Sequence, residues 1–482
     1  MSTNKGEKIL QLENTYAKLP AVFYSLQKPV PVSKPNLVLF NKSLAKDLGL
    51  EFLNQQRDLI SNYLSGNEIP DGSKPLAQAY AGHQFGHFTM LGDGRAILLG
   101  EQIDPNGKRF DIQLKGSGQT PYSRRGDGRA SLYSMLREYL ISESMHHLGI
   151  PTTRSLAVVS TGEKVFREQV HNGAILTRIA ASHIRVGTFE YVSNFCTKED
   201  LQILTKYTIK RHYPELSDKE NPALELLKVV MQKQIDLIVN WMRVGFIHGV
   251  MNTDNMSIAS ETIDYGPCAL MNSYNLNTVF SSIDTYGRYA YGNQPNIAQW
   301  NLTAFANSLL PIIAENQNEA IELAKDVLKD FQHIFKEKWY KMMFDKLGIF
   351  RPTEKDEDLV NDLLSLMKTN KSDYTQVFLA LQHNKKLDNP LFNKQEFNHW
   401  IQKWNSPHHA PDFELMKRSN PKIIPRNHWV EDALEAAVEG NMIPFNQLFS
   451  KLSEPYGNHP DEFVFEEIPK EFDVNYQTFC GT

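Results

Sequence analysis

Alternating apolar and polar residues predict a strand hairpin in the first third of the chain. Ala96 to Ile103 is an apolar, strand-like run, and Asp104-Pro105-Asn106-Gly107 after it has the residue types of a tight turn. From Arg109 to Lys115 apolar and polar side chains alternate, with Phe110, Ile112 and Leu114 on one face and Asp111, Gln113 and Lys115 on the other. We therefore predict two paired strands, which follow the glycine turn Gly92-Asp93-Gly94 and end in a lysine.

Helical spacing of apolar residues predicts several helices elsewhere. One helix is expected from about Ala130 to Leu148, ended by Gly149, and a longer one from Glu225 to Gly245. A helical segment is also expected around Trp429 to Ser450. Strands and helices in separate stretches indicate an α+β fold.

Two cations in Leu176 to Arg185 suggest an anion site. Arg178 and Arg185 are seven residues apart, so in a helix their side chains would project from one face, two turns apart. Two converging guanidinium groups suit a polyphosphate. The alternative, of about equal weight, is a pair of surface arginines in ion pairs.

Composition narrows the class of protein. The net charge of −5 argues against general nucleic-acid binding. The polar start lacks a signal-peptide core, and no apolar run approaches the roughly 18 residues of a membrane span. Three cysteines in 482 residues exclude a disulfide framework and fit a reducing compartment. We expect a cytoplasmic protein, a monomer, with no nucleic-acid or membrane partner.

The order of parts is that of a protein kinase. A glycine turn, a strand hairpin ending in Lys115 and a helix bearing Glu138 are the parts of a kinase small lobe, in which the glutamate holds the lysine. Glu143 is the second candidate for that glutamate. Between them Gly116 to Arg129 (GSGQTPYSRRGDGR) is rich in glycine, arginine and hydroxyl groups, which can bind phosphate oxygens. An ordinary hairpin with a surface lysine is the alternative for the first segment alone.

The second part of a kinase pattern follows the long helix. His248 to Asn255 (HGVMNTDN) resembles a catalytic loop, and Asp264-Tyr265-Gly266 takes the place of the magnesium-binding Asp-Phe-Gly. Asn255 and Asp264 offer the oxygen ligands that Mg²⁺ requires. The kinase base, five residues before the asparagine, is replaced by Val250, and the nearest carboxylate is Asp254. This favours a different transfer reaction, with a nucleotide-binding pseudokinase and a small-molecule kinase as alternatives.

Long motifs in this chain resemble those of the selenoprotein O (YdiU) family over nearly the whole sequence. The segments are AGHQFG, LGDGR, LKGSGQTPYSRRGDGR, GIPTTR, HGVMNTDNMS, DYGP and SSIDTYGRYAYGNQP. The resemblance implies a kinase-like bilobal fold that binds ATP in a flipped orientation and transfers AMP to Ser, Thr or Tyr hydroxyls of proteins, releasing pyrophosphate. UMP transfer with manganese is the alternative for bacterial members.

The resemblance also implies functional residues and an organisation. Asp254 matches the proton acceptor, and Asn255 and Asp264 match the Mg²⁺ ligands. The nucleotide contacts are matched by Gly92, Gly94, Arg95, Lys115, Asp127, Gly128, Arg178 and Arg185, together with Asp264. We expect an N-terminal extension (1–74), a small lobe (75–180), a large lobe (181–405) and a helical C-terminal extension with a redox tail (406–482).

Two further features are the C-terminal cysteine and a pair of histidines in a loop. Cys480 stands near the end, where some animal members of the family carry selenocysteine, and we hypothesise a reversible disulfide with Cys268, with Cys196 as the other candidate partner and an unpaired thiol as the alternative. His408 and His409, in the break at Ser406 to Pro411, are interpreted as part of a solvated loop, because no further metal ligands stand at matching spacing.

Overall fold

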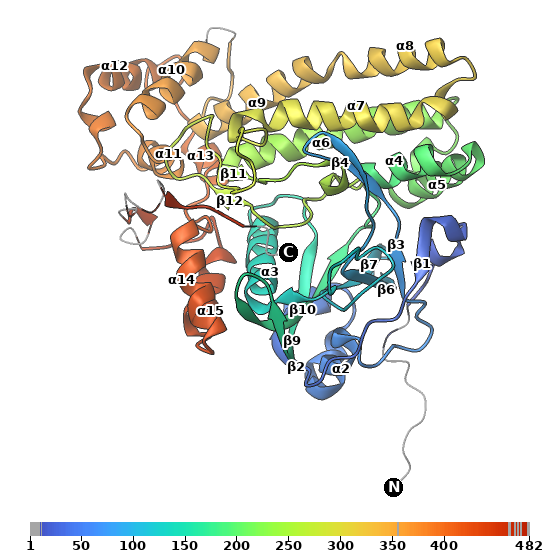
Figure 1. Ribbon diagram of the computed structural model, residues 1–482. Helices are drawn as coiled ribbons and strands as arrows, with labels where there is room; N and C mark the ends of the chain where they lie inside the picture. The colour runs from blue at the N-terminus through green and yellow to red at the C-terminus, as the bar shows by residue number, and fades with distance from the viewer. Residues whose placement is uncertain are drawn as a thin grey trace.

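One large antiparallel sheet organises the N-terminal part of the molecule. The computed structural model (Figure 1) describes residues 10, 12–353, 356–460, 464–466, 469, 472 and 475–479. Within that part of the chain the sheet has eight strands in the order β1-β3-β6-β7-β10-β9-β2, with β8 paired to β10. The strands are β1 Tyr24–Leu26, β2 Asn36–Phe40, β3 Leu76–Gln78, β6 Ala96–Ile103, β7 Arg109–Lys115, β8 Ala130–Ser131, β9 Arg154–Phe166 and β10 Val170–Ala180.

The predicted hairpin is confirmed, with β6 and β7 beginning and ending at the predicted residues. The two strands pair antiparallel, so that Ala96 lies opposite Lys115. Residues before Pro75 supply β1 and β2, at opposite edges of the same sheet.

The prediction of a helix from Leu176 to Arg185 is wrong. Residues up to Ala180 form the end of β10, and Arg185 caps the following helix. Alternation explains the strand, because Leu176 packs into the core on one face of the sheet while Ile175 and Ile179 pack into the core on the other. Two-residue periodicity and β-branched side chains therefore outweigh the seven-residue spacing of the arginines.

Helices cover both faces of this sheet. On one face lies α3 (Leu132–His147), against β9 and β10, and on the other lie α1 (Lys42–Asp47) and α2 (Arg57–Ser65). The expected helix at 130–148 is thus confirmed as α3. Its N-terminus is capped by Ser131, whose hydroxyl accepts the backbone N–H of Ser134.

The rest of the chain is mainly helical, and most of its helices lie above the sheet in Figure 1. The expected long helix is α6 (Pro222–Val244), which begins with Pro222 and ends at Gly245 in the left-handed region, with φ of 77°. The other helices are α4 Val186–Phe195, α5 Lys198–His212, α7 Gln294–Ile313, α8 Gln317–Leu328, α9 Phe331–Leu347, α10 Asp356–Thr369, α11 Tyr374–Gln382, α12 Gln395–Trp404, α13 Phe413–Ser419, α14 Asn427–Val438 and α15 Ile443–Leu452.

Two short hairpins and the C-terminal helices complete the fold. The hairpins are β4 (Ala81–Gln84) with β5 (His87–Met90), and β11 (Phe246–Ile247) with β12 (Ala269–Leu270). The helical segment expected near the C-terminus is confirmed as α14 and α15, which pack beside α3. Among the described helices, none combines the length and apolar character that crossing a bilayer requires.

Candidate active site

Three cations from three elements converge on one carboxylate. Lys115 ends β7, Arg178 lies on β10 and Arg185 precedes α4. Their nitrogens lie 2.9 Å (Lys115 Nζ), 2.6 Å (Arg178) and 2.9 Å (Arg185) from the carboxylate oxygens of Asp264. All three cations are buried. The structure therefore brings together four of the residues that the sequence nominated for nucleotide binding.

Helix α3 supplies the expected glutamate. Glu138 Oε2 accepts a hydrogen bond from Lys115 Nζ at 2.6 Å, and both side chains are buried. The predicted Lys115–Glu138 contact is therefore confirmed. Glu143, the second candidate, is wrong for this role, because its carboxylate binds the Arg154 guanidinium at 2.9 and 2.6 Å.

The polar face of β7 is buried and continues the site. Gln113 accepts two hydrogen bonds from the Arg178 guanidinium, at 3.2 and 2.6 Å, and donates to Asp93 Oδ2 at 3.2 Å. Burial raises the pKa of Asp93 to about 6, although nearby Arg185 acts to lower it. The buried polar side chains of this strand face thus hold the Arg178 guanidinium in its orientation.

Asp264 is held ionised by its neighbours. Burial acts to raise its pKa, but Lys115, Arg178 and Arg185 together hold the pKa well below its ordinary value. The residue has a φ of 61°, in the left-handed region that aspartate tolerates better than most side chains. The carboxylate is therefore a permanent anion, shared among three cations that could instead bind phosphate oxygens.

Asp254 lies beside this cluster with a carboxylate of different character. Its side chain is buried, and its Oδ1 has no hydrogen-bond partner among the described residues. Burial raises the pKa of Asp254 to about 6, against the opposing effect of Arg185. Arg185 also donates to the backbone carbonyl of Asp254 at 2.9 Å, which joins the two aspartates through one guanidinium.

The β4–β5 hairpin packs closely over Asp254. A Cβ at Gly82 would lie 2.5 Å from Asp254 Oδ1, so only glycine fits there. The backbone N–H of His83 donates to the Thr253 hydroxyl at 2.7 Å, and that of Phe85 donates to Asn252 at 3.1 Å. This hairpin carries most of the AGHQFG motif, and its position over the Asp254 loop explains the first glycine of the motif, Gly82.

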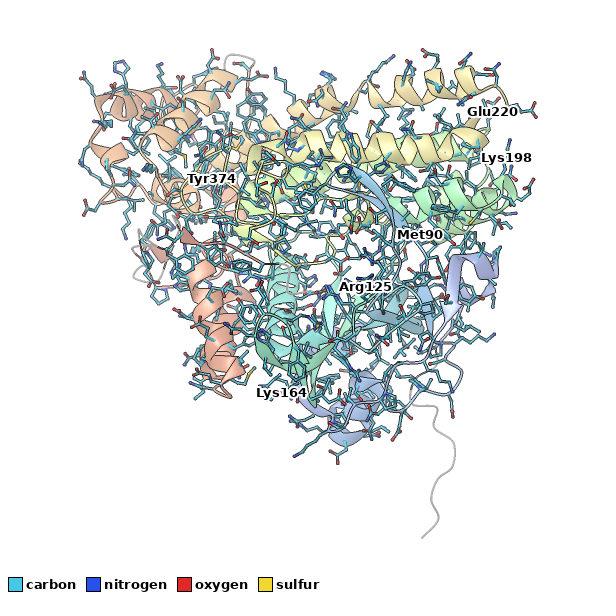
Figure 2. All side chains as sticks on the ribbon, viewed as in Figure 1. Met90, Arg125, Lys164, Lys198, Glu220 and Tyr374 are labelled. Carbon is cyan, nitrogen blue, oxygen red and sulfur yellow. The ribbon has the colours of Figure 1, made fainter. Side chains whose placement is uncertain are left out.

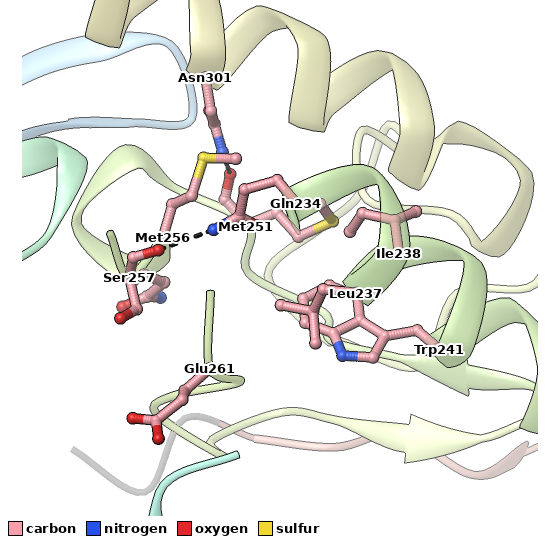
Figure 3. A pocket seen from close by; sticks show the side chains of 10 residues that line it. Gln234, Leu237, Ile238, Trp241, Met251, Met256, Ser257, Glu261 and Asn301 are labelled. Atoms are coloured by element: carbon pink, nitrogen blue, oxygen red, sulfur yellow. Dashed lines mark hydrogen bonds between the residues drawn. The ribbon is translucent and has the colours of Figure 1, made fainter. Parts of the chain in front are cut away.

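Two side-chain amides hold the loop from Met251 to Ser257 in place (Figure 3). Gln234 of α6 donates to the carbonyl of Ser257 at 2.7 Å, and Asn301 of α7 donates to the carbonyl of Met251 at 3.0 Å. Asn255 donates to the carbonyl of Val250 at 2.9 Å, which directs its amide oxygen to the other side. The cavity drawn in Figure 3 has a volume of about 10 Å³, which is room for one water molecule and not for a nucleotide.

The glycine turn and the arginine-rich loop pack on each other. A Cβ at Gly92 would lie 2.4 Å from the Tyr122 ring, and the Ser123 hydroxyl donates to the carbonyl of Gly94. Gly128 has a φ of 67° and approaches Gly118 so closely that a Cβ would lie 2.1 Å from its carbonyl oxygen. Both glycine segments therefore need their glycines for close backbone approach.

The remaining predicted contacts are not drawn into the Asp264 cluster. The carboxylate of Asp127 pairs with Arg167, with both N–O distances at 2.9 Å, and lies on the surface. Arg95 is half-buried, while Arg125 on the same loop as Asp127 is exposed at the centre of Figure 2. Their roles in nucleotide binding stay predictions.

Sequence reasoning missed three parts of the site. Gln113 and Asp93 were seen only as strand and turn residues, and the ring of Tyr80, 4.5 Å below the Arg185 guanidinium, carried no signal.

Cys480 lies outside the described residues, so its proposed disulfide stays a hypothesis. Cys268 is buried. Pro267, the residue before Cys268, accepts a hydrogen bond at its backbone carbonyl from the Thr478 hydroxyl at 2.7 Å.

Comparison with known proteins places the chain in a family. The family model described as "Protein adenylyltransferase SelO" matches residues 8–453. "Protein nucleotidyltransferase YdiU" of Brevibacillus brevis is 55% identical over 98% of this chain and 97% of the relative. Proteins of the same name from Halalkalibacterium halodurans and Clostridium botulinum are 54% and 55% identical, over 100% and 98% of both chains. The chain therefore belongs to the SelO protein adenylyltransferase family, a family of nucleotidyltransferase enzymes.

Proposed function

We propose that this enzyme transfers AMP from ATP to Ser, Thr or Tyr hydroxyl groups of proteins and releases pyrophosphate. The observation that carries the proposal is the convergence of Lys115, Arg178 and Arg185 on Asp264, beside the separate carboxylate of Asp254. The three buried cations share the carboxylates of Asp264 and Glu138, and together they suit the charge of a polyphosphate.

The cations would bind the β- and γ-phosphates. With ATP in the flipped orientation, Lys115, Arg178 and Arg185 would neutralise the pyrophosphate that leaves when the α-phosphate is attacked. Glu138 and Gln113 already fix Lys115 and Arg178, so little reorganisation is needed when the nucleotide binds. The cations thereby lower the barrier at the leaving-group end.

Asp254 would accept the proton of the attacking hydroxyl. Its pKa of about 6 leaves it mostly ionised at neutral pH, yet basic enough to take a proton in the transition state. Its Oδ1 has no hydrogen-bond partner among the described residues, so it could accept that hydrogen bond without giving up another one. Val250, in the place of the kinase base, has no group that could replace it.

Asn255 and Asp264 fit a divalent cation. One ionised carboxylate and one amide oxygen are the hard ligands that Mg²⁺ or Mn²⁺ takes beside phosphates. Bound there, the metal ion would supply further positive charge to the phosphates. Asp264 would exchange part of its contact with the three cations for contact with the metal ion.

We also propose a kinase-like bilobal fold. Its support is the lysine strand and glutamate helix in the sheet part, and the loop with Asn255 and Asp264 in the helical part. The four-part division at residues 75, 181 and 406 and the cytoplasmic location belong to the same proposal.

Mass spectrometry separates the possible reactions. The enzyme and a protein acceptor are incubated with ATP and Mg²⁺, and in parallel with UTP and Mn²⁺. A mass increase that matches AMP supports the proposal. An increase that matches phosphate indicates ordinary kinase chemistry, one that matches UMP only indicates uridylyl transfer, and no increase in any reaction indicates a pseudokinase.

A further inference from the structure

A second cluster of metal-ligand side chains lies where the loop after α12 meets the start of α10. Asp356, the first residue of α10, and the neighbours His408 and His409 place one ligand atom each within 4.8 Å of one another. In Figure 1, α10 and α12 lie at the upper left, away from β7 and β10. The cluster is therefore separate from the nucleotide site.

His409 is held in the orientation of a metal ligand. Its Nδ1 lies 2.9 Å from the carbonyl oxygen of Lys403, which can only accept a hydrogen bond, so Nδ1 is the donor. Its Nε2 lies 2.8 Å from Asp356 Oδ1, and the ring is only 10% exposed. Metal-bound histidines commonly donate their second ring N–H to a backbone carbonyl in this way.

The Asp356 carboxylate is held in one orientation by Thr353. Its Oδ2 accepts the backbone N–H of Thr353 at 2.6 Å and the Thr353 hydroxyl at 2.9 Å, which leaves Oδ1 directed at His409. A buried, oriented carboxylate oxygen therefore faces a buried, oriented imidazole nitrogen.

The exposed ring of His408 completes the set. It lies beside the ring of His409, with 4.9 Å between the ring centroids. A tetrahedral zinc site, with bonds of about 2.1 Å, needs ligand atoms about 3.4 Å apart. His409 Nε2 and Asp356 Oδ1, which are 2.8 Å apart, must therefore separate slightly when they bind the ion. The ligand atom of His408 lies within 4.8 Å of both, and its exposed ring can adjust to bring that atom to the required distance.

We propose that Asp356, His408 and His409 bind one transition-metal ion of the zinc type, with water as the fourth ligand. Two imidazoles with one carboxylate suit zinc, whereas Mg²⁺ requires oxygen ligands in octahedral geometry. The ion would tie the Ser406–Pro411 loop to α10. The two histidines, interpreted from sequence as part of a solvated loop, gain through folding the third ligand that was missing from that view.

Zinc binding to the full chain tests the proposal. Equilibrium dialysis against ZnCl₂ is carried out in excess Mg²⁺ and without nucleotide, with His408→Ala as the main variant, because that exposed ring can be removed without opening the fold. We expect one zinc ion per wild-type chain and at least a tenfold weaker zinc affinity in the variant. Loss of a residue that only hydrogen-bonds to a metal ligand already weakens metal affinity about tenfold or more, and loss of a ligand itself should weaken it at least as much.

Two controls locate the ion. His399→Ala removes an exposed histidine of α12, and Asp264→Asn alters the nucleotide cluster; both should keep the zinc ion. Zinc should also raise the Tm of the wild-type protein and not that of His408→Ala. Equal zinc binding by wild type and His408→Ala, no binding at all, or loss of the ion in Asp264→Asn would overturn the proposal.

Discussion

Replacement of Asp254 by asparagine should make the protein more stable while it slows transfer. The pKa of this carboxyl is raised from 3.8 to about 6, mainly by burial. A difference of about 2 units, at about 1.4 kcal/mol per unit, means that the ionised carboxylate costs the folded state about 3 kcal/mol at neutral pH. Asp254→Asn keeps the shape of the side chain and removes that cost.

The pH dependence gives the sign of the effect. The folded chain keeps the Asp254 proton to a higher pH than the unfolded chain does, so the cost is absent below pH about 4 and complete above pH about 6. For 482 residues the entropy of unfolding is about 1 kcal/mol per kelvin. We therefore expect Asp254→Asn to melt about 3 °C above wild type at pH 7.5, and at nearly the same temperature near pH 4.

Differential scanning calorimetry of both proteins across that pH range measures the difference. Asp127→Asn is a matched control of opposite sign, because the pKa of Asp127 is lowered by its hydrogen bonds with Arg167. That variant should melt at or slightly below the wild-type temperature at pH 7.5. If Asp254→Asn melts no higher than wild type at pH 7.5, Asp254 is not a desolvated carboxylate and its role as base loses its physical support.

Three further predictions concern the same site. Asp264→Ala should lower the rate of transfer at least about 100-fold at saturating Mg²⁺, since the cations and the metal ion lose their shared anion. Its circular dichroism spectrum should stay that of the wild type, and near-normal turnover would refute the metal assignment. In Gly187→Ala the new Cβ would lie 2.1 Å from the carbonyl oxygen of Ala81 and 3.3 Å from Asp254 Cα. This variant should lose about 1–3 kcal/mol of stability, measured by urea unfolding, and its transfer should be at least about tenfold slower. Unchanged activity would show that the packing of β4 on the Asp254 loop is not needed. The value of kcat/KM should fall about tenfold per pH unit below pH about 6, where Asp254 becomes protonated, and the residual activity of Asp254→Asn should lack this dependence; the same inflection in that variant would assign it to another group.

Local features of the fold could be predicted from the sequence, and long-range contacts could not. The bounds of β6 and β7 follow from a turn with alternation on one side of it. Apolar spacing and glycine stops predict α3 and the end of α6, whereas α6 begins at Pro222, before the expected Glu225. The segment that contains Arg178 failed because seven-residue spacing fits a helical face, while its burial on two faces of a sheet is visible only after folding.

The candidate site shows the same division. Lys115 and Asp264 are 149 residues apart, and the family motifs nominated both, but no pattern in the sequence shows that their atoms lie 2.9 Å apart. Glu138 and Glu143 are five residues apart, so their side chains point about 140° away from each other on α3, and only the register of the helix on the sheet decides which one meets the lysine. Polar residues on β7 resemble a solvated strand face, whereas here Gln113 is buried beneath the cations.

Labelling with ATP that carries ³²P at either the α- or the γ-phosphate tests the central claim most directly. The cations that converge on Asp264 should retain the β- and γ-phosphates, with the α-phosphate toward Asp254. We predict that label from [α-³²P]ATP, and not from [γ-³²P]ATP, becomes attached to protein with release of pyrophosphate. Lys115→Ala should lose this labelling through weaker ATP binding, and Asp254→Ala should keep ATP affinity but slow the transfer. Attachment of label from [γ-³²P]ATP alone would show that ATP binds in the ordinary kinase orientation, and would contradict the account.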